Sequence, residues 1–314
     1  MTLKFLLTLS LTASIIIAET QVSEAQKKAK KSDATTMISM PDLDLNTPEG
    51  AMKANRKIQA SLKDGENCWY YWEGNVYSRV PGEKDRQLFT YIAMNVRATK
   101  TFQDSVKGYG YRQVSKEILL YMDPKTKQVV NKWQNPFTGK EVDVVHIAND
   151  PVNQPPMYAN TPGREYKFGA RVNDGYFFQL FEVPLFYSNP LAGDYQDQIG
   201  GAYQAIEIFN FSGPVKEIIR GDKDRGDDVI VAWSRVSKWL PWMENGDKAG
   251  QLVFSGLGKK VDAFDKLPET LKSEIKSNPL YAGYEVAPPL DDVRSNETSW
   301  TYYKKWFAEK KKKR

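Results

Sequence analysis

Short runs of aromatic and β-branched residues alternate with clusters of Gly, Pro, Asn and Asp between residues 66 and 256. This pattern predicts β-strands joined by turns, including one turn at residues 73–75. The expected strands are residues 67–73, 75–80, 87–97, 113–122, 128–133, 141–148, 165–172, 175–187, 203–211, 228–237 and 250–255. No long helical period separates these runs, so parallel crossover units are not expected and the sheet should be antiparallel.

Helices are expected only near the two ends of this β-rich region. Thr47, Pro48 and Glu49 supply a cap, a first helical residue and a negative charge at a helix N-terminus. A second helix is predicted over residues 266–277. The predicted fold class is therefore mainly β. We expect an antiparallel β-barrel or strongly curved sheet, lipocalin-like in general architecture, with a few peripheral helices; the alternative is a β-sandwich.

Five of the expected strands carry a titratable residue on a face that otherwise reads as apolar or aromatic. Because side chains alternate along a strand, each of these residues shares a face with its neighbours two positions away. They are Glu73, Glu117, His146, Glu207 and Arg235. For any one of them the alternative is that the side chain faces solvent. The recurrence over several strands favours a polar-lined ligand cavity.

His146 is the only histidine, and it comes directly before the polar turn 149–153. An imidazole titrates near neutral pH, which makes His146 the first candidate for proton transfer. Asp150 or Asn149 would orient the ring, and Glu117 or Glu207 would act as a second acid or base. The alternative is a structural histidine at a strand–turn junction, beside a turn built by its own Asn and Asp side chains.

The expected ligand-binding residues complete this hypothesis. Arg97 or Arg235 would anchor an anionic group, and aromatic side chains would form the walls of the cavity. The full set is Arg97, Arg235, Tyr121, Trp233, Asn149, Asn153 and Glu73. A chain with one histidine and one cysteine, Cys68, lacks a conventional zinc site, and no dinucleotide fingerprint is present. We therefore expect no metal and no cofactor.

The N-terminus carries the pattern of a signal peptide. Lys4 precedes an apolar stretch over residues 5–18, and a small-x-small cleavage pattern ends at Ala25. The stretch is too short to span a bilayer, so we expect cleavage, no transmembrane segment in the mature chain, and an exported, periplasmic or secreted protein. The predicted organisation is a signal peptide over 1–25, a disordered linker over 26–45, a single β-rich domain over 46–303 and a basic C-terminal tail over 304–314.

The net charge of +5 comes from basic runs in the two tails, because the region between them is slightly acidic. No face interleaves basic and aromatic residues, so a nucleic-acid partner is not expected. The tails should contact anionic surfaces weakly at most, and should be dispensable for folding because they contain little apolar surface. The expected partner is a small apolar or aromatic molecule.

Several segments spread over the mature chain carry a family resemblance. They are residues 71–83, 123–126, 133–139, 145–146, 149–153, 233–235, 239–243, 288–292 and 296–300, among them the sequences YWEGNVYSRVPGE, WQNPFTG, NDPVN and NETSW. With these segments the chain resembles domain-of-unknown-function family 1838, known from bacteria and filamentous fungi. The resemblance implies one domain over most of the chain and adds no activity or catalytic residue.

Two hypotheses for the function follow. The first is an exported small-molecule-binding β-barrel protein with cofactor-independent acid/base chemistry, of isomerase, cyclase or lyase type, on an aromatic or apolar ligand. The second is a non-catalytic envelope or interaction protein that binds a polymer or partner through its basic tails and aromatic surface. Convergence of the charged residues in one cavity would favour the first hypothesis, and scattered solvated charges would favour the second.

Overall fold

The computed structural model describes residues 40–188 and 201–312. The expected signal peptide over residues 1–25 and the linker up to residue 39 lie outside the described residues. None of the described helices is both long enough and apolar enough to cross a membrane.

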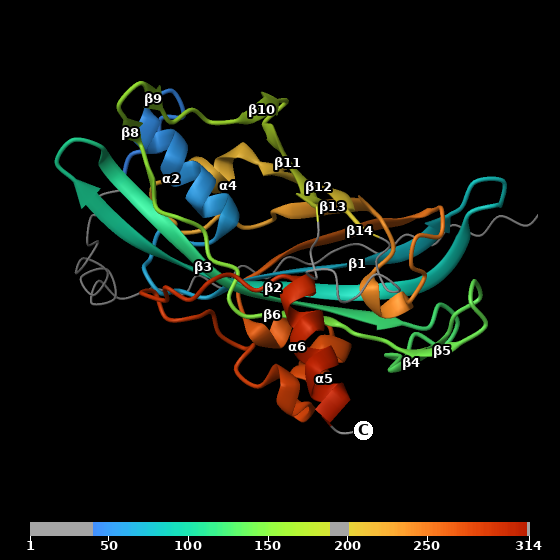
Figure 1. Ribbon diagram of the computed structural model, residues 1–314. Helices are drawn as coiled ribbons and strands as arrows, with labels where there is room; N and C mark the ends of the chain where they lie inside the picture. Colours follow the sequence, from blue (N-terminus) through green and yellow to red (C-terminus); the bar gives the residue numbers. More distant parts are fainter. Residues whose placement is uncertain (1–39, 189–200, 313–314) are drawn as a thin grey trace, which may run out of the picture. The chain divides into compact units, whose positions relative to one another are not determined.

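A ten-stranded antiparallel sheet forms the body of the described chain (Figure 1). Its order is β10-β11-β12-β13-β14-β1-β2-β3-β6, and β7 also pairs with β3. The strands are β1 (Cys68–Arg79), β2 (Arg86–Asp104), β3 (Gly108–Met122), β6 (Ile147–Asn149), β7 (Met157–Tyr158), β10 (Ala170–Asn173), β11 (Tyr176–Tyr187), β12 (Tyr203–Pro214), β13 (Ile230–Ser237) and β14 (Gln251–Val261). The mainly β, antiparallel prediction is confirmed. Within the described ranges no pairing between the edge strands closes the sheet into a barrel.

The remaining elements are two small sheets, four α-helices and three 3-10 turns in the described chain. Two two-stranded sheets pair β4 (Lys132–Gln134) with β5 (Glu141–Asp143) and β8 (Asn160–Thr161) with β9 (Arg164–Glu165). The helices are α2 (Pro48–Gln59), α4 (Val215–Ile219), α5 (Glu269–Ser277) and α6 (Ser299–Lys312), with single 3-10 turns η1 (Pro241–Met243), η2 (Phe264–Lys266) and η3 (Pro279–Tyr281).

The two faces of the sheet carry separate apolar clusters, as the alternation of side chains requires. We call one the inner face; its buried cluster includes Tyr70, Trp72, Tyr91, Tyr121, Phe211, Trp233 and Phe254. The outer face of β1–β3 carries Ile92, Met94, Val96, Ile118 and Leu120, and α5 covers it with Leu271 and Ile275. The predicted helix over 266–277 is thus confirmed as α5, with η2 before it.

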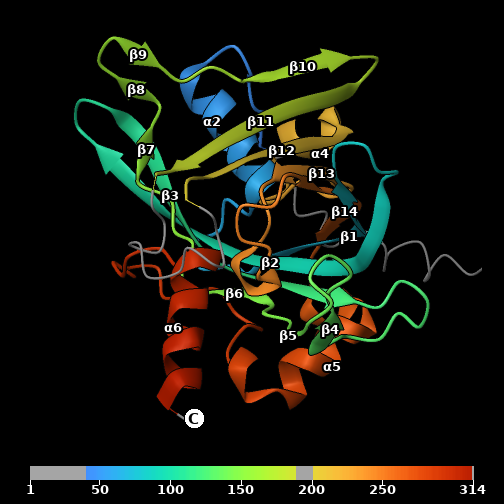
Figure 2. The ribbon, with the colours of Figure 1, turned by 45° about the vertical axis from the view of Figure 1, so that its right-hand side comes forward.

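Helix α2 begins as the sequence predicts and joins two distant parts of the sheet. The Thr47 hydroxyl accepts a hydrogen bond from the Gly50 amide at 3.1 Å. On the buried side of the helix, Asn55 donates to the Tyr111 hydroxyl of β3 at 2.9 Å and accepts from Gln179 of β11 at 2.9 Å. These strands are six places apart in the sheet order, so α2 links the two arms of the curved sheet (Figure 2).

One predicted strand break is absent from the structure, and one predicted strand is divided in two. β1 continues through Gly74 without a turn, because Gly74 pairs with Gly256 and a Cβ at Gly74 would collide with the Ser255 backbone. The predicted strand 141–148 is instead two short strands, β5 and β6, which pair with different partners. His146 lies in the break between them, and its Nδ1 accepts a hydrogen bond from the Tyr121 backbone amide at 3.1 Å.

Both predicted tail boundaries also differ from the structure. Within residues 40–45 of the expected linker, the Leu43 amide bonds to the Ile219 carbonyl at 2.7 Å and Leu43 packs against the inner-face cluster. The expected domain end at residue 303 falls inside α6, which continues to Lys312. Trp306 and Phe307 pack against the inner-face cluster, and Lys310 pairs with Asp143. The basic C-terminal residues up to 312 are therefore the second half of a docked helix.

We expect Trp306→Ala to lower the free energy of unfolding by about 2 kcal/mol, because it removes a half-buried ring from the contact between α6 and the inner-face cluster. Denaturant unfolding of the full chain measures this loss. The exposed Lys304→Ala on the same helix is the control and should stay within about 0.5 kcal/mol of the wild type. Equal stability of all three proteins would show that the helix contributes nothing and that the tail is dispensable.

Candidate functional site

A pocket of about 610 Å³ opens on the inner face of the sheet. Its lining combines residues of β1, β2, β3, β6, β7, β11, β12 and β13 with α2, the loop 152–154 and the segment 296–300, which leads into α6. This volume is in the range of sites for drug-sized molecules, roughly 300–1,000 Å³. The antiparallel register places the lining residues in the site, because positions two apart on each strand point to the same face.

Aromatic and aliphatic side chains form most of the pocket wall. They include Trp72, Leu119, Phe181, Phe209, Phe211, Trp233 and Trp300. Trp233 is held by ring contacts on several sides, with centroid distances of 5.6 Å to Tyr91, 5.6 Å to Phe254 and 6.1 Å to Trp72. Such packed rings give a rigid apolar wall suited to an apolar or aromatic ligand.

Glu207 and Arg235 form an ion pair in this wall. They are directly opposite each other on β12 and β13, and Arg235 Nη1 lies 2.9 Å from Glu207 Oε1. The Arg235 side chain is 6 % exposed and the Glu207 side chain 20 % exposed. Arg235 Nη2 also donates to the Tyr203 hydroxyl at 2.7 Å. The guanidinium of Arg235 is therefore neutralised and oriented by its neighbours on the sheet.

Glu117 is a second acid in the pocket, and no cation pairs with it among the described residues. It lies opposite Asn149 on β6, whose Nδ2 donates to Glu117 Oε1 at 2.5 Å. Burial raises the pKa of the Glu117 carboxyl, and the nearby charge of Glu207 raises it further; the bond from Asn149 opposes both effects without cancelling them. Glu117 therefore keeps its proton to a higher pH than an ordinary glutamate does.

Arg97 is a fourth charged side chain in the pocket and is 8 % exposed. Its Nε donates to Asn95 Oδ1 at 2.5 Å, and its Nη1 donates to Gln59 Oε1. The guanidinium lies over the ring of Tyr70, 4.9 Å from the centroid, and 6.0 Å from that of Phe211. In the part of the chain that the structure describes, Arg97 makes no ion pair, and burial lowers its pKa.

The C-terminal residues 292–300, here called the rim segment, cover one side of the pocket. Asn296 and Asn153 form a reciprocal pair: the Asn153 amide donates to Asn296 Oδ1 at 2.7 Å, and Asn296 Nδ2 donates to the Asn153 carbonyl at 2.8 Å. The Glu297 amide donates to the Pro151 carbonyl at 2.8 Å. The Asn296 side chain and the Glu297 amide thus fasten the rim segment to the backbone of the turn 149–153.

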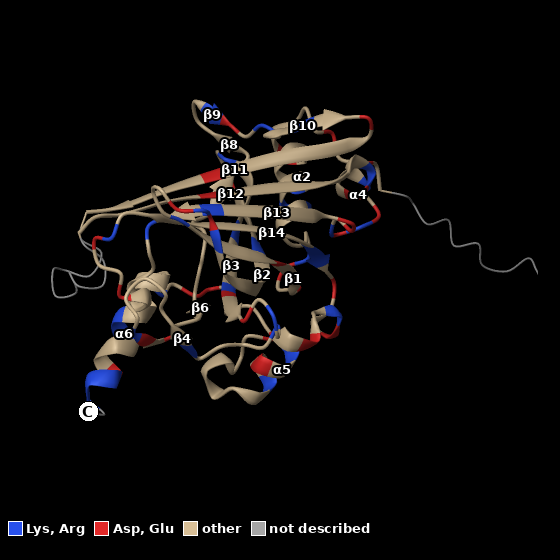
Figure 3. Cartoon of the chain, turned by 90° about the vertical axis from the view of Figure 1, so that its right-hand side faces the viewer, with Lys and Arg blue, Asp and Glu red and all other residues tan. Residues whose placement is uncertain are grey.

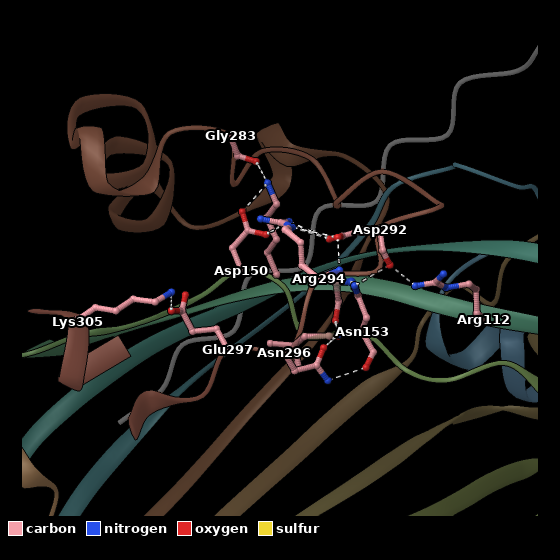
Figure 4. Close-up of polar contacts among 12 residues, drawn as sticks. Arg112, Asp150, Asn153, Gly283, Asp292, Arg294, Asn296, Glu297 and Lys305 are labelled. Atoms are coloured by element: carbon pink, nitrogen blue, oxygen red, sulfur yellow. Dashed lines mark hydrogen bonds and ion pairs between the residues drawn. The ribbon is translucent and has the colours of Figure 1, made fainter. Parts of the chain in front are cut away.

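An ion network holds the start of the rim segment (Figure 4). Arg294 pairs with Asp150 at 2.6 Å and with Asp292 at 2.8 Å, and Lys116 pairs with Asp150 at 3.2 Å. The hydrogen bonds from Arg294 lower the pKa of the Asp292 carboxyl to about 2. Asp292 is therefore ionised at physiological pH and keeps its ion pair with Arg294 there.

The structure brings together seven of the eleven predicted site residues. The pocket lining contains Arg97, Glu117, Asn149, Asn153, Glu207, Trp233 and Arg235. The polar turn 149–153 does form part of the rim. For Glu117, Glu207 and Arg235 the alternation of side chains along β3, β12 and β13 predicted the face correctly; Arg97 of β2 was predicted only as an anchor for an anionic group.

His146, predicted as the proton carrier, does not line the pocket. The ring is 8 % exposed and stacks on Tyr121, with 6.0 Å between ring centroids. Because Nδ1 accepts the bond from the Tyr121 amide, the proton of the neutral ring is on Nε2. Burial lowers the pKa of His146 to about 4. The structure thus places His146 in the core as a neutral residue that stabilises the break between β5 and β6.

Three further predicted residues lie outside the pocket lining. Tyr121 is fully buried behind the wall, 5.3 Å from Trp242 between ring centroids. Asp150 is engaged in the ion network of the rim. Glu73 is exposed, on the face of β1 opposite to Trp72, so it is not part of the cavity.

The sequence interpretation missed the polar residues around Arg97 and the rim segment. Asn95 and Arg97 alternate on one face of β2, and Asn55 and Gln59 are one turn apart on the buried side of α2, so both pairs carried a readable signal. The pairing of Asn153 with Asn296 spans 143 positions. No local pattern predicts a contact of that separation.

Comparisons with known proteins identify a family for this chain but no activity. A family model described as "Protein of unknown function (DUF1838)" matches residues 65–307. No curated protein matches the chain. Two solved structures of Ail, the attachment invasion locus protein of Yersinia pestis, one of them in complex with the heparin analogue sucrose octasulfate, are similar over 63 % of this chain and 100 % of theirs, at 9 % identity. Their TM-scores are 0.17 and 0.18.

We expect the free energy of unfolding of His146→Gln to fall less between pH 7 and pH 4 than that of the wild type. The pKa of His146 lies below its ordinary value of 6.5, at about 4, so the folded state resists protonation and its stability falls as the pH drops from 6.5 towards 4. Denaturant unfolding at pH 7 and pH 4 should show roughly 3 kcal/mol more loss for the wild type than for the variant. Glutamine keeps an acceptor for the Tyr121 amide, and identical losses would contradict a neutral buried His146.

We expect Arg294→Gln to loosen the rim segment, because it removes the ion pairs to Asp150 and Asp292. The loss of about 1 kcal/mol should speed amide hydrogen exchange in residues 292–300 roughly fivefold, as measured by mass spectrometry of peptides. Arg220→Gln is the matched control, since it breaks an exposed ion pair with Asp222 outside the rim. Unchanged exchange in the Arg294 variant would show that the network does not hold the segment.

Proposed function

We propose that this chain, which belongs to the DUF1838 family of proteins of unknown function, binds a small apolar or aromatic molecule in the inner-face pocket and transfers a proton on it without a cofactor. The observation that carries the proposal is the Glu117 carboxyl, which lines an aromatic pocket and has a raised pKa. Strongly perturbed carboxyls in clefts are candidates for general acid–base catalysis.

In this proposal Glu117, and not the predicted His146, is the acid/base residue. An imidazole with a pKa of about 4, outside the pocket lining, offers neither access nor a suitable proton affinity. Glu117 lines the pocket, and its raised pKa brings the carboxylate closer to neutral pH, where a general base works best. Glu207 contributes through its charge, which raises the pKa of Glu117.

The chemistry that suits this arrangement is removal of a proton from carbon next to a carbonyl group. The Glu117 carboxylate accepts the proton while the electron pair of the C–H bond moves onto the carbonyl oxygen as an enolate. The guanidinium of Arg235, fixed by Glu207 and Tyr203, stabilises the negative oxygen. Return of the proton from Glu117 to the same or a neighbouring carbon completes an exchange or an isomerisation, so atoms and charge balance without an oxidant.

The expected location remains part of the proposal. The pattern of Lys4 and the apolar residues 5–18 supports an exported protein, periplasmic or secreted. The aromatic lining supports an apolar or aromatic ligand, and the proposal names no nucleic-acid partner.

One observation favours the second hypothesis, a protein that binds a partner. The outward side of β11–β14 exposes Phe178, Leu180, Phe186 and Leu257, with exposed fractions of 39 %, 54 %, 65 % and 61 %. Charged residues are sparse along these strands (Figure 3). Exposed apolar patches of this kind are common at interaction surfaces. The proton-transfer function is the better supported of the two, because the charged residues of several strands converge in one pocket.

We expect the wild type to exchange the acidic C–H protons of an aromatic ketone for deuterium. The measurement is mass spectrometry of 2-tetralone and related ketones with a benzylic C–H next to the carbonyl after incubation in buffered D₂O. Glu117→Gln should lower the rate by about 100-fold or more, the usual contribution of a general base. Glu207→Gln should shift the pH–rate profile to lower pH, because it removes a charge that raises the pKa of Glu117.

Glu73→Gln is the matched control, since Glu73 is an exposed glutamate on the opposite face of the same sheet. Its exchange rate should equal that of the wild type. A Glu117 variant as active as the wild type, or exchange that the Glu73 variant loses equally, would rule out the proposed role of Glu117.

A further inference from the structure

The pocket contains two buried arginines with different surroundings. Arg235 has a carboxylate partner at 2.9 Å, and its charge is matched within the protein. Arg97 makes no ion pair in the described ranges, although it is as buried as Arg235, at 8 % against 6 % exposure; Glu117 acts on it only through a longer-range charge interaction. An unpaired buried charge destabilises the folded state unless a counter-ion reaches it. This asymmetry indicates that the partner of Arg97 comes from outside the chain.

The guanidinium of Arg97 is oriented in advance. Asn95 takes the Nε proton and Gln59 takes one proton of Nη1, which leaves the second proton of Nη1 and both protons of Nη2. The rings of Tyr70 and Phe211 hold the plane of the group. The free edge between Nη1 and Nη2 has the fork geometry that binds a planar carboxylate through two hydrogen bonds.

We infer that the Arg97 end of the pocket binds the carboxylate of an amphipathic organic acid, whose apolar or aromatic body lies against Phe209, Phe211 and Trp233. The inference rests on the proposed function in taking the same pocket as the ligand site, and it names the substrate class. One unpaired guanidinium matches one negative charge. A phosphate dianion would leave a second charge unmatched, beside the carboxyls of Glu117 and Glu207.

The position of Arg97 relative to Glu117 would bring a bound acid close to the proposed base. On the paired strands β2 and β3, Asn95 is opposite Glu117 and Arg97 is opposite Ser115, so Arg97 and Glu117 are diagonal neighbours on the inner face. Such diagonal neighbours lie roughly 7 Å apart. An acid held by Arg97 therefore places the carbons nearest its carboxylate within reach of Glu117. Its apolar end extends toward Trp233 and the rim segment.

The test compares acids with their uncharged amides by isothermal titration calorimetry at pH 8. The probes are 2-naphthoate with 2-naphthamide and decanoate with decanamide, titrated into the full chain. The wild type should bind at least one acid about 10-fold or more tightly than its amide. Arg97→Gln should remove this preference, and Arg97→Lys should keep a weaker one because lysine offers no fork. Arg79→Gln, which breaks an exposed ion pair with Asp85 away from the pocket, should behave like the wild type.

The possible outcomes separate the two proposals. Amides that bind as tightly as acids to the wild type would overturn the carboxylate inference and leave the pocket as a ligand site. Tighter binding of 2-naphthyl phosphate than of 2-naphthoate would also overturn it, in favour of phosphate. Binding of none of the probes would contradict both proposals. An acid preference that depends on Arg97, together with no effect of Glu117→Gln on proton exchange, would support the inference and refute the proton transfer.

Folding of the Arg97 variants is checked by thermal unfolding. Arg97→Gln removes an unpaired buried charge, so it should not lower the melting temperature of the free protein. The comparison of acid and amide in the wild type decides the inference even if a variant fails to fold.

Discussion

The hydrogen bonds of Asn55 are the contact on which the pocket depends. One side-chain amide donates to Tyr111 on β3 and accepts from Gln179 on β11, two strands that do not pair with each other. A second link lies at the rim, where Trp300 packs on Tyr203 of β12. Helix α2 closes one end of a pocket whose walls are largely apolar, and the charged residues of the inner face are mostly buried there. Their electrostatic properties follow from that enclosure.

Enclosure acts differently on each charge. Arg235 and Glu207 neutralise each other across two paired strands. Glu117 has only an amide partner, so its raised pKa reflects burial and the charge of Glu207. Arg97 has amide and aromatic partners and no anion. The pocket thus combines an ion pair, a carboxyl with a raised pKa and a cation without an ion-pair partner, which is a suitable set for binding an acid and moving a proton on it.

Much of this arrangement could be predicted from the sequence. The period-two alternation of β3, β12 and β13 assigned Glu117, Glu207 and Arg235 to one face, because a strand gives each residue only two choices. His146 was misplaced, since the run 141–148 reads as one strand and its division depends on pairing with β3 and β4. Gly74 was read as a turn, although it serves a close approach of two backbones. The rim segment and α6 depend on contacts between positions far apart in the sequence. Trp306 and Phe307 lie among many lysines, so the sequence reads as a solvated tail although both rings pack against the inner-face cluster.

The two ends of the rim segment are attached by interactions that respond differently to salt: ion pairs at Arg294 and ring packing at Trp300. Arg294 is 53 % exposed, and its ion pairs lie at the surface, where dissolved ions screen them over about 8 Å at physiological ionic strength. Trp300, at the other end, is buried against Tyr203 with 4.3 Å between ring centroids, a contact that salting-out ions strengthen. Rising ionic strength therefore weakens the ion pairs at one end of the segment and leaves the ring contact at the other end in place. In concentrated salt the segment is held mainly by Trp300 and by the hydrogen bonds that join Asn296 and Glu297 to Asn153 and Pro151.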